Sequence, residues 1–93
     1  MTPGERERLY LLAEECAEVI QMVNKILRHG FANYHPDDPE KVSNRVRLHE
    51  EMTDVEAVLS MLHDENDIPV ITSKSVMERK AKKLRYTYYQ GTR

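Results

Sequence analysis

The sequence predicts an all-α fold: two long antiparallel helices plus a shorter third, with a four-helix core completed by dimerisation. Apolar residues recur at helical spacing in three segments, and no strand pattern is longer than "PVIT". The chain has 93 residues, which corresponds to a single domain spanning 1–93. A domain this small buries a modest fraction of its surface, so association with a second copy is a natural way to complete its core.

The first helix is expected from about Glu5 to His29, because Gly30 follows two basic residues in a typical C-terminal signal. Cys16 lies in the middle of its apolar stripe and is expected to be a buried small hydrophobe. The stretch "FANYHPDDPEKVSN" that follows has two prolines and no periodicity, which predicts a long loop. The stripe comprises Leu9, Leu12, Cys16, Val19, Ile20, Val23 and Leu27.

The second helix is expected to begin near Ser43 or Asn44, either of which is a suitable N-cap, and to end around "HDENDIP". The third helix is expected to open at Ser75, because Glu78 follows at the spacing of a capping box. The apolar stripe of the second helix is Leu48, Met52, Val55, Val58, Leu59 and Leu62, and that of the third is Met77, Ala81, Leu84 and Tyr88.

Composition narrows the class of protein. A net charge of -2 argues against a nucleic-acid partner. The single cysteine rules out an internal disulfide and fits a reducing compartment. The charged start "MTPGERERLY" has no apolar signal-peptide region, and no apolar run approaches the length of a membrane span. We therefore expect a cytoplasmic protein with no membrane and no nucleic-acid partner.

Pairs of acids three residues apart occur four times, so this spacing alone has little specificity. Two of the pairs fall in segments rich in Asp, Asn and Pro, and these are expected to be solvated turn residues. The other two lie in the middle of helices, and Glu51 falls inside the apolar arc formed by Val55 and Val58. The mid-helix pairs are Glu15/Glu18 and Glu51/Asp54, and the turn pairs are Asp37/Glu40 and Asp64/Asp67.

Carboxylates that converge in a low-dielectric place repel one another and lose hydration. Either some of them protonate or a cation neutralises them. Ligand sets made only of oxygen select a hard ion, and Mg²⁺, or Mn²⁺, is usual where phosphates complete the shell. The alternative is that Glu51 pairs with Arg47, four residues earlier, while the other acids reach water.

The segments "EECAE" and "EEMTD" resemble the E-x-x-E and E-x-x-D halves of the MazG-like nucleotide pyrophosphohydrolases, the all-α NTP pyrophosphatase superfamily. "LLAEECAEVIQMVNKILRHG", "NRVRLHEEMTDVEAVLSML" and "AKKLRYTYYQG" extend the similarity to small stand-alone members from bacteria and phages. The resemblance implies a helical fold built from dimers or dimers of dimers. It also implies Mg²⁺-dependent hydrolysis of a nucleoside triphosphate to a monophosphate and pyrophosphate. The implied metal ligands are Glu15, Glu18, Glu51 and Asp54.

Further roles follow as hypotheses. Glu15 and Glu18 are the candidates for the catalytic base, because Glu51 looks too buried to be free. Candidate phosphate-binding residues are Lys25, close to Glu18 around the first helix, and Arg79, Lys80 and Lys83, which could equally form a solvated helix face. The alternative function is a non-catalytic helical dimerisation or partner-binding module. The retained Glu51 favours the enzyme, because a pure scaffold would gain stability from leucine at that position.

Overall fold

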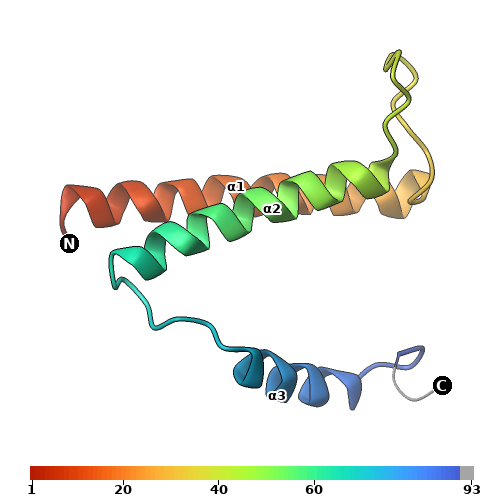
Figure 1. Ribbon diagram of the computed structural model, residues 1–93. Helices are drawn as coiled ribbons and strands as arrows, with labels where there is room; N and C mark the ends of the chain where they lie inside the picture. Colours follow the sequence, from red (N-terminus) through yellow and green to blue (C-terminus); the bar gives the residue numbers. More distant parts are fainter. Residues whose placement is uncertain (91–93) are drawn as a thin grey trace.

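The computed structural model describes residues 1–90, and this part of the chain is helical, as predicted. It contains α1 (Pro3–His29), α2 (Asn44–Asp64) and α3 (Ser73–Leu84). Helices α1 and α2 run antiparallel, side by side, and α3 lies apart from them at the end of an extended segment (Figure 1). No helix of the described residues has the length and apolarity to cross a bilayer. Residues 91–93 of the expected 1–93 domain lie outside the described residues.

Capping fixes the two ends of α1. The Thr2 hydroxyl accepts from the backbone N–H of Glu5 at 3.1 Å, and the Glu5 side chain accepts from the N–H of Thr2 at 2.8 Å. This reciprocal pair, with Pro3 in the first turn, starts the helix slightly earlier than predicted. At the other end Gly30 has a φ of 87°, a conformation that side chains disfavour, and its N–H donates to the Ile26 carbonyl.

The connection from α1 to α2 folds back onto the start of α2. The predicted N-cap Ser43 accepts from the N–H of Val46 at 3.3 Å. The backbone N–H groups of the first two helical residues also find partners in the loop. The N–H of Asn44 donates to the Asn33 carbonyl at 2.7 Å, and the N–H of Arg45 donates to the Phe31 carbonyl at 2.9 Å. The buried Asn44 side chain also donates to the Gly30 carbonyl. These bonds give a long loop a defined conformation.

An ion pair fixes the direction in which the chain leaves α2. Asn66 adopts a left-handed conformation (φ 59°), and the N–H of Asp67 donates to the Leu62 carbonyl, which closes the helix in a Schellman-type turn. The Asp67 carboxylate then binds the Arg8 guanidinium of α1 in a bidentate pair, with exposures of 13% and 16%. The hydrogen bond from Arg8 lowers the pKa of Asp67. The prediction of a solvated turn was therefore wrong for Asp67.

The face of α1 that packs on α2 is not the predicted stripe. Met22 and Ile26 of α1 and Val58 and Leu62 of α2 form the buried core. Met22 and Ile26 belong to a second apolar face, roughly a quarter of a turn round α1 from the predicted stripe, whereas Val58 and Leu62 lie in the stripe predicted for the second helix. Most of the predicted stripe is exposed, and Cys16, expected to be buried, is exposed with it. We call this exposed surface the α1 stripe; it consists of Leu9, Cys16, Ile20, Val23 and Leu27.

Helix α3 begins two residues earlier than predicted. Its N-cap is Thr72, whose hydroxyl accepts from the N–H of Ser75, so the proposed capping box of Ser75 and Glu78 was wrong. The helix ends at Leu84, and Tyr88 of its predicted stripe lies beyond it. Within residues 1–90, α3 packs against neither α1 nor α2. Its apolar side chains are therefore exposed, notably Val76 and Met77.

Candidate metal site and adjoining cavity

Four carboxylates meet halfway along the α1–α2 hairpin. Glu15 and Glu18 come from α1, and Glu51 and Asp54 come from α2. Each contributes one oxygen to a group in which all the oxygens lie within 4.8 Å of one another. The structure therefore brings together all four residues that the sequence selected. We call this group the acid cluster.

The acid cluster occupies the packed seam between the helices. Glu51 precedes Val55 and Val58 by one and two turns on the same side of α2, and Glu15 and Glu18 precede Met22 on α1. These are positions where a helix pair normally places apolar side chains. The acids therefore interrupt a seam that packing alone would fill with hydrophobic residues.

Within residues 1–90, two oxygens of the cluster are buried without a hydrogen-bond partner, Oε2 of Glu15 and Oε2 of Glu51. Burial raises the pKa of Glu51, and the adjacent Glu18 carboxyl raises it further. Burial likewise raises the pKa of Glu15, followed by the charges of Glu18 and Asp54. The sequence indicated a buried carboxylate at Glu51, and the structure shows that Glu15 also has a buried, unpartnered oxygen. Both groups are in surroundings that disfavour their charged forms.

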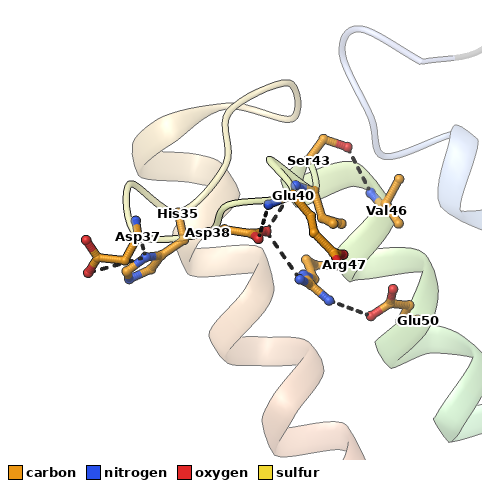
Figure 2. A network of polar contacts seen from close by, with 9 residues as sticks. His35, Asp37, Asp38, Glu40, Ser43, Val46, Arg47 and Glu50 are labelled. Atoms are coloured by element: carbon orange, nitrogen blue, oxygen red, sulfur yellow. Dashed lines mark hydrogen bonds and ion pairs between the residues drawn. The ribbon is translucent and has the colours of Figure 1, made fainter.

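The alternative pairing of Glu51 with Arg47 was wrong. The Arg47 guanidinium contacts Glu50 Oε2 at 3.3 Å and Asp38 Oδ2 at 3.4 Å, so it turns toward the loop (Figure 2). Among residues 1–90, the ion pairs include none with a member of the acid cluster. The charge of the cluster is therefore not balanced by a basic side chain of the described chain.

The acid cluster has the donor set that a divalent cation requires. Mg²⁺ is bound by oxygen atoms at about 2.0–2.1 Å in an octahedron, which places opposite ligands about 4 Å apart. Oxygens that lie within 4.8 Å of one another can reach this arrangement with small side-chain movements. The two unpartnered oxygens supply a further reason, because a cation would satisfy both. The residues present fit a hard divalent ion.

A cavity of about 620 Å³ adjoins the acid cluster, between the end of α1, the loop and the start of α2. Glu51 lines it, so the cavity and the cluster share a side chain. Lys25, one of the predicted phosphate-binding residues, also lines it. Three lining residues were not predicted from the sequence: Arg28 of α1, and Tyr34 and His35, which the loop brings to the same cavity. The length of the loop was the one signal that pointed to Tyr34 and His35.

The other predicted phosphate-binding residues lie elsewhere in the chain. Arg79, Lys80 and Lys83 line a separate cavity of about 730 Å³ between α3 and the segment that precedes it. Among the described residues, none of those that line this cavity is acidic. Within one chain, the structure therefore brings Lys25 to the cavity beside the acid cluster and does not bring the three basic residues of α3 there.

Comparison with known proteins finds no matching protein-family model, no similar curated protein and no similar solved structure. A function for this chain therefore has to be inferred from its own residues and their geometry.

Proposed function

We propose that the protein is a Mg²⁺-dependent nucleoside triphosphate pyrophosphohydrolase that converts a (d)NTP and water to a (d)NMP and pyrophosphate. The observation that supports this proposal most is the acid cluster, with its two buried and unpartnered oxygens. The adjoining cavity has room for a nucleotide and carries the basic groups Lys25 and Arg28. The E-x-x-E and E-x-x-D spacings, which resemble those of MazG-like enzymes, give the same reaction class.

In this proposal Glu15, Glu18, Glu51 and Asp54 hold the cation. Mn²⁺ would suit the same oxygen ligands. The cation, when bound, supplies positive charge to the triphosphate and lowers the pKa of a water molecule. Glu51 and Glu15 contribute mainly as ligands, because each has an oxygen buried in the seam. Glu18, which lies against both, is the better placed to orient the attacking water and accept its proton, and Glu15 is the second candidate.

The reaction can be tested by incubating the purified protein with each common NTP and dNTP in the presence of Mg²⁺. We expect pyrophosphate and a nucleoside monophosphate as products, with label from H₂¹⁸O in the monophosphate, because water attacks the α-phosphorus. Chelation of Mg²⁺ should stop the reaction. Release of orthophosphate would assign a different hydrolysis, and an inactive protein would favour the non-catalytic dimerisation or partner-binding module.

We also propose that the working form is a homodimer or homotetramer with a four-helix core. The α1 stripe supports this proposal, because Ile20 is 62% exposed and Leu27 is 78% exposed in the single chain. Helix α3 presents exposed apolar side chains and packs on neither helix of its own chain. Association of two copies would bury both surfaces and could bring the basic residues of α3 to the partner's acid cluster.

Replacing Ile20 by lysine should dissociate the assembly, because a charge at the centre of the α1 stripe would have to be buried at the interface. The fold of the single chain should persist, since Ile20 is exposed in it. Light scattering coupled to size exclusion measures the mass against the 10.9 kDa of one chain. Gln21→Lys, at the exposed neighbouring position, is the matched control and should leave the mass unchanged. A monomeric native protein would contradict the proposal.

A further inference from the structure

We propose that the cavity between the end of α1, the loop and the start of α2 receives the nucleoside part of the substrate, with the ring of Tyr34 against the base and Lys25 and Arg28 beside the phosphates. This inference rests on the proposed function, and it assigns a specific role to the loop. The cavity volume of about 620 Å³ is in the range of small-molecule sites and exceeds what a base and a sugar need.

The acid cluster adjoins one end of the cavity, and this determines which end would hold the phosphates. Glu51 belongs to both, and Met22 of the seam also lines the cavity. Lys25 lies seven residues beyond Glu18, which is about 10 Å along the helix axis. A lysine side chain spans most of that distance, so its ammonium can reach phosphates held at the cluster. The part of the substrate farther from the cation would then extend toward the loop.

The two basic groups of α1 in the cavity remain available for an anion. Lys25 has no ion pair among the described residues, and Arg28 donates only to the Asn24 carbonyl of its own helix, at 3.4 Å. Arg47 differs, because Asp38 and Glu50 already neutralise it. Lys25 and Arg28 are therefore the basic groups of this cavity that a phosphate can engage.

The loop wall of the cavity is already ordered. The Asp38 carboxylate accepts from the N–H of Glu40 at 2.9 Å and from the N–H of Val42 at 3.0 Å, and it also contacts Arg47. Figure 2 shows these bonds converging on Asp38 between the loop and α2. A bridge between Tyr34 and Ser43 pairs the two sides of the loop. A wall held by such bonds needs little ordering when a ligand binds.

The loop wall of the cavity carries two flat rings. Tyr34 and His35 both line the cavity, and the backbone of Tyr34 is fixed by its N–H bond to the Asn33 side chain. His35 Nδ1 accepts from the N–H of Asp37 at 3.1 Å, which orients its ring. An aromatic ring offers a nucleobase a face on which to stack. The chemistry of the wall therefore suits a base, and the chemistry near α1 suits phosphate.

The test compares two ligands that differ by the nucleoside. Dissociation constants are measured with Mg²⁺ for the α,β-imido analogue of the best substrate and for inorganic tripolyphosphate, which has no base or sugar. For Tyr34→Ala we expect about tenfold weaker binding of the nucleotide analogue. Its binding of tripolyphosphate should be unchanged.

Tyr34→Phe keeps the ring and should behave as the native chain. Lys25→Ala should weaken both ligands. Tyr10→Ala, at an exposed tyrosine of α1 outside this cavity, is the control.

Equal binding of the nucleotide analogue by Tyr34→Ala and the native chain would overturn the inference, as would an equal loss for both ligands. The Mg²⁺-induced rise in melting temperature of each variant separates a local change from loss of the fold. Failure of the proposed function gives a different result, since the native chain itself would then release no pyrophosphate from any nucleotide.

Discussion

Without divalent cations, the Glu51→Leu variant is expected to unfold at a higher temperature than the native chain. The variant removes a carboxylate whose Oε2 is buried without a partner, and places an apolar side chain beside Val55 and Val58. Each kcal/mol of stability corresponds to roughly 4–8 °C in a domain of this size. Mg²⁺ at a hundred times its dissociation constant should stabilise the native chain by about 2.7 kcal/mol. It should stabilise the variant much less.

The effect of the buried carboxylates on the stability of the fold should depend on pH. The pKa values of Glu15 and Glu51 are raised above the ordinary 4.5, so near that pH the folded chain holds protons that the unfolded chain has released. The contribution of these groups to stability is therefore full below pH 4.5 and is lost as the pH rises through the raised values. Mg²⁺ should restore stability at neutral pH and have little effect at pH 4, where protons compete with it.

The control for Glu51→Leu is Glu56→Leu, because Glu56 is an exposed acid on the same helix outside the acid cluster. It should not change the response to Mg²⁺. Identical Mg²⁺ responses of the native chain and Glu51→Leu, measured by calorimetry or circular dichroism, would contradict a cation site at this position.

Replacing Glu18 by glutamine should lower kcat by about 10²–10⁴-fold, the usual contribution of a positioned general base. The amide keeps the size of the side chain but cannot accept the proton from water. Because three carboxylates would remain, the variant should still bind Mg²⁺, with reduced affinity. Measuring kcat at saturating Mg²⁺ separates the chemical step from weakened metal binding.

Glu14→Gln is the matched control for this experiment, because it removes the same charge from an exposed position of the same helix, outside the acid cluster. We expect it to retain native activity. A Glu18→Gln variant with native kcat would remove Glu18 as the base, and Glu15→Gln would then be the next variant to measure.

The four members of the acid cluster were predicted from two signals: helical periodicity, which places residues three apart on one face, and the resemblance that paired "EECAE" with "EEMTD". Glu51 was the strongest signal, since a carboxylate inside an apolar arc breaks the pattern that packing favours. The N-cap Ser43 and the end of α1 at Gly30 were predictable for the same local reason. Local signals succeed where the determining interactions are themselves local.

Periodicity did not identify the face of α1 that packs within the chain. The α1 stripe and the face containing Met22 and Ile26 are both apolar, and a pattern of spacing does not say which partner covers each face. The α1 stripe looked like a core because it has the properties of one, although α2 does not cover it. The prediction that Cys16 is buried was wrong for the same reason, because Cys16 belongs to the α1 stripe.

Acids in turns were equally ambiguous. Asp64, the last residue of α2, and Asp67, just beyond it, were both expected in a turn. Within residues 1–90 only Asp67 of the two forms an ion pair, with an arginine 59 residues away. The cavity wall could not be foreseen either, because its shape depends on Asp38 binding two backbone N–H groups and Arg47. Such contacts arise from the tertiary fold, and residue type alone does not specify them.

Binding of a divalent cation by the acid cluster can be seen directly in a crystal structure of the protein grown with Mn²⁺ and measured for anomalous scattering. We expect an anomalous peak in the seam between α1 and α2, about 2.0–2.5 Å from carboxylate oxygens of both helices. Glu15, Glu18, Glu51 and Asp54 should supply those oxygens. A structure without a peak there, with the four carboxylates turned to water or to a basic residue of a second copy, would contradict it.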